Sequence, residues 1–495
     1  MNNKDILLDF KTNSESFYLS FHQRKRVCFL LRINFYRHLR KHSLFRKPSF
    51  KGGVHPPDNK HFTSATPIEE LPPPERVIIP LSMHIGAPAQ IAVKRGDPVK
   101  IGQIIGESGG FISSPVHASV SGEVASVGPL PHPSGKHSTA VEIANNCKDE
   151  ITRFKPLDKS WREAAPGEII QKIASCGIVG MGGAGFPTHV KLSPPSEKKI
   201  DTLIINCAEC EPYLTSDYRL ILEKTNEILC GMLILKKTLG AKTAYIGIED
   251  NKPEAIEAIK KAMADARFDG VKIAKLQTKY PQGGEKQLIN AITKREVPSG
   301  GLPMDVGCVV QNTGTSYAVW DAVCNGTPLY QRIVTIAGSG VAKPANLLVR
   351  IGTPISHVLN HCGADLSRCK KVIMGGPMMG ITISELDAPV IKSTSGLILY
   401  DDIQPGVGEF ECIHCGRCVK ACPIQLSPYA LVKYVNKELF SEAEEWSVLD
   451  CIECGSCAYV CPAKINIVQY IKLGKYHVTE ARKAAAAEQR KKEEG

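Results

Sequence analysis

The sequence predicts a multidomain α/β protein, in which two β-rich modules lie on either side of an open α/β layer and a cysteine-rich domain follows. Three observations support this prediction. At 495 residues the chain is too long for a single hydrophobic core. Residues 165–325 alternate helix-like and strand-like segments, as an open α/β layer does. Residues 412–461 contain eight cysteines in two short runs of identical spacing.

The first segment, 1–47, is a basic arm. Residues 1–60 hold 13 Lys and Arg against 4 Asp and Glu, a net +9 of the total +11. Three interpretations stay open: the arm lies on an anionic membrane surface, it binds nucleic acid, or residues 1–45 precede the natural start, since the next methionine is Met83. No nucleic-acid recognition fold follows the arm, so no nucleic-acid partner is expected. No apolar run approaches the ~18 residues of a membrane-spanning helix.

Residues 48–150 are expected to form the first β module. The Pro- and Gly-rich stretch 48–80 is typical of an extended lead-in. From 78 to 143, short β segments alternate with glycine turns and resemble half of a lipoyl-type barrel sandwich. Carriers of that family modify a lysine at a hairpin tip. Since no lysine lies between Lys100 and Lys136, the module is expected to be structural.

The open α/β layer is expected over residues 151–328. The patterns predict strands at 202–206, 243–248 and 271–276, and helices at 220–239 and 253–266. Gly240 suits the C-cap of the first of these helices, and Pro253 suits the first turn of the second.

The remaining domains follow in order along the chain. A short β/α module with glycine turns is expected over 329–398, and the cysteine domain over 399–475. Residues 476–495 are predicted to form a charged, alanine-rich helical tail. The tail is expected to stay solvated because it lacks an apolar face, with pairs such as Glu488 and Lys492 supporting the helix.

Both cysteine runs follow the pattern C-x2-C-x2-C-x3-C-P, which is typical of proteins that hold two [4Fe–4S] clusters. Two-residue gaps wrap three thiolates around a cubane corner, and the proline turns the fourth thiolate toward the other cubane. This rule assigns one cluster to Cys412, Cys415, Cys418 and Cys461, and the other to Cys451, Cys454, Cys457 and Cys422. Structural zinc is the alternative, but zinc sites usually split two CxxC pairs by a long loop. Thiolate ligands of this kind indicate a reducing compartment, the cytoplasm.

The segment 180–191, GMGGAGFPTHVK, contains the pattern G-x-G-x-x-G. Alone this pattern is weak evidence for a dinucleotide site, and the helix-like run before it and Pro187 within it oppose a Rossmann strand–turn–helix. A glycine loop whose amides cradle a flavin phosphate fits better, with Lys191 neutralising the phosphate. A plain glycine turn is the alternative. The candidate loop residues are Gly180, Gly182, Gly183 and Gly185.

This loop resembles the FMN-binding loop of the flavoprotein subunit of respiratory NADH dehydrogenase, and three further motifs follow in the same order. They are NCAECEP at 206–212, YPQGGE at 280–285 and QNTGT at 311–315, with Ala208 and Gly284 departing from the family pattern. The resemblance implies cofactor contacts for Asn206, Glu209, Gly283, Glu285, Asn312 and Thr315, and nicotinamide nucleotide contacts for Phe186 and Glu211. The CxxC of Cys207 and Cys210 is a possible redox dithiol, but an incidental role is favoured.

The whole order of modules resembles the C subunit of Rnf-type electron transport complexes over residues 50–480, with further likeness at GGPMMG (375–380). The implied fold is a lipoyl-like β barrel-sandwich module, an open α/β flavin domain, a β-grasp-like ligand-binding module and a two-cluster ferredoxin-like domain. The implied cofactors are two [4Fe–4S] clusters, FMN and NAD(H), and hydride transfer requires no acid–base side chain, so no catalytic residue is named.

The resemblance also implies a role and a place. The chain would be a peripheral NADH-linked oxidoreductase subunit on the cytoplasmic face of a bacterial inner membrane. Its partners would be the integral membrane and iron–sulfur subunits of a complex that couples electron transfer to ion translocation. Two alternatives stay open: an electron-wire and scaffold subunit with an empty flavin fold, and a soluble iron–sulfur oxidoreductase acting on another carbon substrate.

Overall fold

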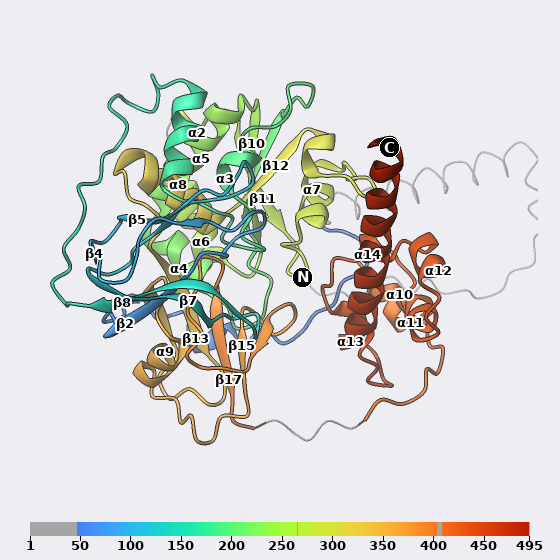
Figure 1. Cartoon of the computed structure of the whole chain (residues 1–495). Coiled ribbons are helices and arrows are strands. Elements are labelled where there is room, and N and C mark those ends of the chain that lie inside the picture. The colour runs from blue at the N-terminus through green and yellow to red at the C-terminus, as the bar shows by residue number, and fades with distance from the viewer. Residues whose placement is uncertain (1–46, 265, 403–407, 495) are drawn as a thin grey trace, which may run out of the picture. The chain divides into compact units, whose positions relative to one another are not determined.

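A computed structural model describes residues 47–264, 266–402 and 408–494 (Figure 1). The chain divides into a unit of residues 1–47 and a unit of residues 48–495, and the second is described below. The interpretations of the basic arm fall outside the described residues and stay open. In the described part of the chain, no helix combines the length and the apolar character needed to cross a bilayer.

The first β module consists of two small antiparallel sheets, ordered β2-β8-β7-β4 and β3-β5-β6. The strands are β2 (Arg76–Pro80), β3 (Gln90–Ile91), β4 (Pro98–Val99), β5 (Ile104–Glu107), β6 (Val116–His117), β7 (Gly122–Pro131) and β8 (His137–Asn145). Val77, Ile105, Val124 and Ile143 are fully buried between the sheets. Burial of these β-branched side chains explains why the short, glycine-punctuated strands hold together.

The second module is a parallel sheet of order β11-β10-β9-β12. Its strands are β9 (Thr202–Cys207), β10 (Thr243–Glu249), β11 (Val271–Leu276) and β12 (Cys308–Asn312). Its helices are α2 (Pro166–Ser175), α3 (Thr188–Lys191), α4 (Ser216–Glu223), α5 (Thr225–Leu239), α6 (Pro253–Ala262), α7 (Glu285–Thr293) and α8 (Thr313–Cys324). The chain builds outward from β9 through β10 to β11 and then returns to place β12 on the other side of β9. The topological switch point of the sheet therefore lies between β9 and β12.

The three predicted strands are present, but both predicted helices differ from the structure. Residues 220–239 do not form one helix, because the chain breaks at Lys224 (φ −135°, ψ 37°) between α4 and α5. The Thr225 hydroxyl donates to the Ile221 carbonyl at this break, a side-chain bond that competes with helical pairing. Gly240 caps α5 in the left-handed conformation, as predicted. The second helix ends at Ala262 rather than 266, where the Ala264 amide turns to the Lys261 carbonyl.

The third module is a six-stranded sheet of order β1-β14-β13-β17-β15-β16, with α9 (Ile355–His361) beside it. Its strands are β1 (Ile68–Glu70), β13 (Gln331–Ala337), β14 (Ala345–Arg350), β15 (Lys371–Met374), β16 (Ile381–Ile383) and β17 (Gly396–Tyr400). Two expectations are corrected here. The lead-in is not wholly extended coil, because β1 pairs in parallel with β14. The expected boundary at 398 falls inside β17.

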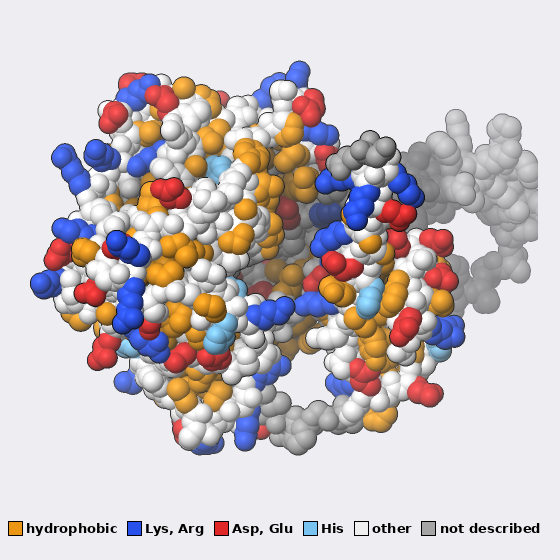
Figure 2. Space-filling model, in the orientation of Figure 1, with side chains coloured by type: hydrophobic (Ala, Val, Ile, Leu, Met, Phe, Trp, Pro, Cys, Tyr) orange, Lys and Arg blue, Asp and Glu red, His pale blue; other side chains and the backbone are white. Residues whose placement is uncertain are grey.

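The cysteine domain is helical and small. It contains α10 (Arg417–Ala421), α11 (Pro428–Asn436), α12 (Phe440–Glu445), α13 (Ser456–Tyr459) and α14 (Ile467–Glu494). The expected boundary at 475 is wrong, since α14 runs through it and Val478 is buried in the same core as Leu431 and Ile471. Beyond Val478, α14 exposes a mixed surface of Lys, Arg and Glu (Figure 2). Glu488 and Lys492 pair at 2.9 Å there, as the sequence predicted.

The contact between α5 and α8 generates a stability prediction. A Cβ on Gly231 would lie 1.8 Å from the Ser316 carbonyl oxygen, so the helices approach backbone to backbone at this point. We expect Gly231→Ala to lower the free energy of unfolding by about 1–3 kcal/mol through overpacking, measured by urea denaturation. Gly167→Ala is the matched control, because a Cβ there meets nothing within 4 Å. Equal stabilities of the two variants would contradict the close helix contact.

Candidate functional site

The glycine loop is a closed hairpin-like turn between α2 and α3. The Gly180 amide donates to the Phe186 carbonyl at 2.8 Å, and the Thr188 amide donates to the Ile178 carbonyl at 3.1 Å. Val179 and Pro187 form a β-bridge between these two bonds. Both ends of the loop are therefore fixed, and its conformation is set by the residues between them.

The interior of the loop has the properties of an anion cradle. Among the described residues, no acceptor is bonded to the amides of Gly182, Gly183, Ala184 and Gly185. A Cβ on Gly182 would lie 2.8 Å from the Asn312 Nδ2 atom, and Gly185 has φ +70° with a Cβ position 2.9 Å from the Met83 carbonyl. A Cβ on Gly183 would meet nothing within 4 Å, so that position faces open space. Free amides around an open space fit a phosphate group.

The four motifs singled out in the sequence meet at the switch point of the parallel sheet. Asn206 at the end of β9 stands opposite Asn312 at the end of β12. The Met181 amide in the glycine loop donates to the Thr315 hydroxyl at 3.0 Å. The Asn206 side chain donates to the Gly283 carbonyl at 2.8 Å. Carboxyl ends of strands at a switch point are where ligands bind in open α/β sheets.

One further ion pair closes the group of motifs. Lys191 donates from Nζ to the Glu285 carboxylate at 2.8 Å and to the Val310 carbonyl at 3.1 Å. The structure thus gives Lys191 protein partners, whereas the sequence assigned it to a phosphate. Its ammonium ties α3 to the start of α7, and a role toward a ligand stays a prediction.

The Asn312 side chain caps α8. Its Oδ1 atom accepts from the amides of Gly314 and Thr315, at 2.8 and 3.3 Å, and its Nδ2 atom donates to Asp217 at 2.6 Å. Burial raises the pKa of Asp217, although the hydrogen bond from Asn312 favours the carboxylate. The sequence pattern did not indicate Asp217, which reaches the site only because α4 begins beside β12.

Arg332 is a second residue that the sequence pattern did not indicate. It is 5% exposed, and its guanidinium donates to the Met181 carbonyl of the glycine loop at 3.4 Å and to the Lys392 carbonyl. Burial lowers the pKa of Arg332 to about 10, while Asp217 opposes this shift, so the side chain remains a cation at neutral pH. A buried cation under the loop strengthens its preference for an anion.

Glu209 lies in the acidic segment after β9 and caps α4. It has φ +44°, and its carboxylate accepts from the Asp217 amide at 2.7 Å and the Tyr218 amide at 3.3 Å. Burial raises the pKa of Glu209 to about 7, and Lys60, 4.0 Å away, opposes that shift. The side chain expected to touch flavin therefore holds the first turn of a helix.

Glu211 reaches into the third module. Its carboxylate accepts from the amides of Met378 and Met379, both at 3.0 Å. A Cβ on Gly376 would lie 2.2 Å from the same carboxylate, so the GGPMMG turn is shaped around it. Burial raises the pKa of Glu211 to about 7, opposed first by these two amides. The GGPMMG turn, which carries part of the family resemblance in the sequence, thus contacts a residue of the candidate site.

Burial disfavours the thiolate form of both cysteines in the CxxC of the acidic segment. Burial raises the pKa of both Cys207 and Cys210 to about 12. Each sulfur also accepts a hydrogen bond inside the site, Cys207 from the Thr313 hydroxyl at 3.2 Å and Cys210 from the Gly283 amide at 3.3 Å. These contacts give the two thiols a structural role.

The first cysteine set surrounds a cavity of about 220 Å³ at the surface of the cysteine domain. Its lining includes Cys412, Cys415, Cys418 and Cys461, the set that the crossing rule assigns to one cluster. Cys412 and Cys415 are exposed, and Ile413 between them is 69% exposed. We call this the outer set.

The second set, Cys422, Cys451, Cys454 and Cys457, is the inner set. Burial raises the pKa of Cys451 to about 11, and the neighbouring thiols of Cys454 and Cys422 add to this shift. Burial also raises the pKa of Cys457. The nearby thiols of the other three members raise it further. In the described part of the chain, no three His, Cys, Asp or Glu side chains converge closely enough to hold a single metal ion. The outer thiols instead line a volume, as the corners of a cubane require.

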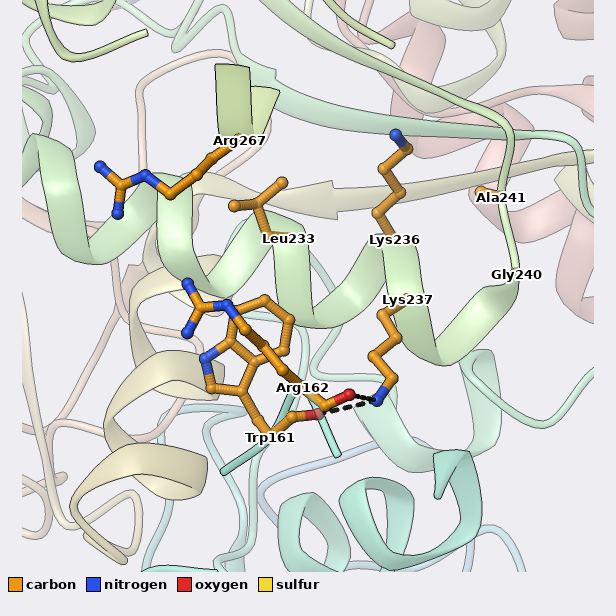
Figure 3. Close-up of a pocket in the computed structure, with 8 residues that line it drawn as sticks. All are labelled: Trp161, Arg162, Leu233, Lys236, Lys237, Gly240, Ala241 and Arg267. Carbon is orange, nitrogen blue, oxygen red and sulfur yellow. Dashed lines mark hydrogen bonds between the residues drawn. The ribbon is translucent and has the colours of Figure 1, made fainter. Parts of the chain in front are cut away.

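A separate basic cavity of about 480 Å³ lies at the C-terminal end of α5, away from these motifs (Figure 3). Lys237 donates from Nζ to the carbonyls of Trp161 and Ala164 at 3.0 and 2.8 Å, and Lys236 to that of Asp269 at 2.9 Å. Cations in the last turn also stabilise the helix dipole. These lysines are accounted for by the fold.

The raised pKa of Glu209 generates a pH prediction. Its folded-state value of about 7 exceeds the usual 4.5, so the stability that it contributes at low pH is lost as the pH rises from 4.5 through 7. We expect Glu209→Gln, which cannot ionise, to flatten the fall in free energy of unfolding between pH 5 and 7, measured by urea denaturation. The exposed Glu257→Gln is the control. Identical pH slopes for wild type and Glu209→Gln would refute the assignment.

Family models match four stretches of the chain. They are described as the RnfC barrel sandwich hybrid domain over residues 48–148, the Nuo51 FMN-binding domain over 173–321, the SLBB domain over 333–382 and a 4Fe-4S dicluster domain over 405–462. The expected order of a barrel-sandwich module, a flavin-type domain, a small third module and a dicluster domain is thereby confirmed.

Curated relatives match nearly the whole chain. The C subunit of the proton-translocating ferredoxin:NAD(+) oxidoreductase complex of Clostridium ljungdahlii is 50% identical over 448 residues, covering 90% of this chain and 96% of that protein. The C subunit of the Na(+)-translocating complex of Acetobacterium woodii is 45% identical, covering 88% and 98%. The C subunit of the ion-translocating oxidoreductase complex of Rhodobacter capsulatus is 43% identical, covering 77% and 74%.

A solved structure of NAD+-reducing [NiFe]-hydrogenase in the H2-reduced state aligns with a TM-score of 0.45 and 19% identity, over 65% of this chain and 64% of that one.

Identity of 50% and 45% over almost the full length of two relatives is decisive for the family. The chain belongs to the RnfC family, the C subunits of the ion-translocating ferredoxin:NAD(+) oxidoreductase complexes.

Proposed function

We propose that this chain is an FMN-binding, two-cluster iron–sulfur subunit that passes electrons between NADH and the other subunits of an ion-translocating complex. The observation that carries the proposal is the meeting of four motifs at the switch point, with unbonded loop amides on one side and a hydrogen bond to the inner cysteine set on the other. FMN, when bound, would convert two-electron hydride transfer into single-electron transfer.

The glycine loop would hold the flavin phosphate through the amides of Gly182, Gly183 and Gly185, with Gly180 closing the loop. Arg332 supplies positive charge beneath it. Asn206 is hydrogen-bonded to Gly283, and Asn312 to Thr315, so we propose that these two pairs give the crevice its shape as well as contacts. Phe186 and Glu211 would face the nicotinamide nucleotide, with Lys191 and Glu285 at the edge of the crevice and Glu209 ordering α4.

Electrons would pass between the flavin and the partner subunits through the inner set first and the outer set second. The inner set touches the flavin-type domain: the Tyr280 hydroxyl donates to the Cys454 carbonyl at 2.8 Å. The outer set has two exposed cysteines and an exposed isoleucine at the surface. In the inner set no cysteine is exposed, whereas the outer set has two that are, so the proposed relay has an inward and an outward end.

The partners would be the other subunits of the complex, integral membrane and iron–sulfur proteins among them. The names of the relatives support this proposal, since they are subunits of proton- and Na(+)-translocating complexes. The place we propose is the cytoplasmic face of a bacterial inner membrane, where NADH is available and thiolate ligands stay reduced.

The second candidate is an electron-wire and scaffold subunit whose flavin fold is empty. The pairing of Lys191 with Glu285, and of Asn312 with Asp217, favours it, because these side chains are already satisfied within the protein. Under this candidate the cysteine sets would still hold clusters.

One experiment separates the two candidates. The full chain is reconstituted anaerobically with iron, sulfide and FMN, and its FMN content and visible spectrum are measured before and after NADH. We expect about one FMN per chain, bleached by NADH. Gly183→Val should lose FMN, because its side chain enters the open space of the loop, and the fold should be kept, since a Cβ there meets no neighbour within 4 Å.

Gly167→Val, whose Cβ is also free of contacts, should retain FMN and serves as the control. Wild-type protein with iron but no FMN would establish the scaffold candidate. FMN bound equally by wild type and Gly183→Val would remove the glycine loop from the site.

The crossed ligand assignment yields a further prediction. We expect Cys412→Ser/Cys461→Ser to lose one cluster and about half of the iron, because both thiols line the same cavity. Cys412→Ser/Cys422→Ser changes one member of each set and should disturb both clusters. Iron analysis and electron paramagnetic resonance (EPR) after reduction provide the readout. Equal loss in the two double variants would exclude the crossed arrangement.

A further inference from the structure

Tyr280 lies where three parts of the chain meet. Its side chain is 2% exposed and packs in a buried cluster with Val54, Ala421 and Cys454. Its backbone pairs on both sides with Val54, at 2.8 and 2.9 Å. Tyr280 of the flavin-type domain thus contacts both the lead-in and the cysteine domain, and this packing restricts its ring.

The Tyr280 hydroxyl stands between an acidic side chain and a cysteine of the inner set. It donates to the Cys454 carbonyl at 2.8 Å, and its oxygen lies 3.4 Å from the Glu211 carboxylate. A phenol has one proton, so it cannot serve both acceptors at full strength. The shorter distance assigns the proton to the Cys454 carbonyl, while each Glu211 oxygen accepts one amide, from Met378 or Met379.

The GGPMMG turn of the third module contacts the same cysteine run. A Cβ on Gly455 would lie 3.0 Å from the Met378 carbonyl oxygen. The turn therefore touches Glu211 through its amides and the residue after Cys454 through a carbonyl. Any displacement of the Glu211 carboxylate changes both the amide contacts and the competition for the Tyr280 proton.

We propose that Tyr280 is a positioning residue that couples Glu211 to the inner cluster by holding the backbone of Cys454. This inference rests on the proposed function. With Glu211 on the amides of the turn, the hydroxyl donates to the Cys454 carbonyl and its partly positive hydrogen stabilises the reduced cluster. When a nucleotide in the crevice displaces the turn amides from Glu211, the freed carboxylate competes for the hydroxyl proton and that stabilisation weakens. Binding at one site thereby alters the potential at the other, and the effect is reciprocal.

The test is an EPR-monitored redox titration of the reconstituted full chain. The inner signal is identified as the one retained in Cys412→Ser/Cys461→Ser. We expect Tyr280→Phe to lower the midpoint potential of the inner cluster and to leave the outer cluster unchanged, because only the inner one loses a donor. Iron content and circular dichroism should match wild type, since the ring remains.

Tyr218→Phe is the matched control. Its hydroxyl donates to the surface residue Glu254 at 3.2 Å and to no cysteine, so its loss should move neither potential. A merely structural role of Tyr280 would leave both potentials in place or shift both together.

A double-mutant cycle tests whether the coupling runs through the hydroxyl. Glu211→Gln removes no hydrogen bond to a cluster cysteine, yet we expect it to shift the inner potential, because the amide replaces a competing acceptor with a donor. In the Tyr280→Phe background the same change should have no further effect. Additive shifts overturn the inference, as does an unmoved inner potential in both single variants. If wild type itself shows no cluster signals, the proposed function fails first, and the inference falls with it.

Discussion

The pairing of β12 with β9 is the constraint on which the site depends. It sets Asn206 opposite Asn312 at the carboxyl ends of two parallel strands, and it places the switch point between them. The other motifs then reach this point from either side: the glycine loop through Thr315, and the loop before α7 through Asn206. A one-residue slip of β12 would reverse which face Asn312 points to and would separate the helix cap from Asp217.

Much of the site could be predicted from the sequence because its signals are local. The glycine loop and the cysteine runs depend on spacing within about a dozen residues, and the four thiols of the outer set line one cavity, while their ligation of a cluster stays a prediction. Asp217 and Arg332 were missed, since each reaches the site from another element and nothing in its own sequence marks it. Lys191 illustrates the same limit, because its partner Glu285 lies 94 residues away.

The fold shows a similar division. Strands with continuous apolar runs were predicted correctly, whereas the break at Lys224 was not, because Lys and Thr fit a helix and only the Thr225 hydroxyl reveals the interruption. Domain limits were least predictable. The lead-in contributes β1 to the sheet of the third module. Helix α14 continues past residue 475, the expected end of the cysteine domain. The modules are thus interleaved, and a boundary drawn in sequence cuts contacts that fold them together.

The lead-in also has a consequence for the order of assembly. The Gly53 amide donates to the Ala421 carbonyl at 2.8 Å, and a Cβ on Gly52 would lie 2.4 Å from the Cys422 carbonyl oxygen. Among the first described residues to leave the ribosome, these two must wait through more than three hundred and sixty further additions before their partners exist. Until then Val54 and the ring of Tyr280 lack their cover from the cysteine domain. The lead-in can therefore complete its packing only after the cysteine domain has been synthesised. A nascent chain stalled before residue 421 would leave Val54 and Tyr280 exposed to proteases and chaperones.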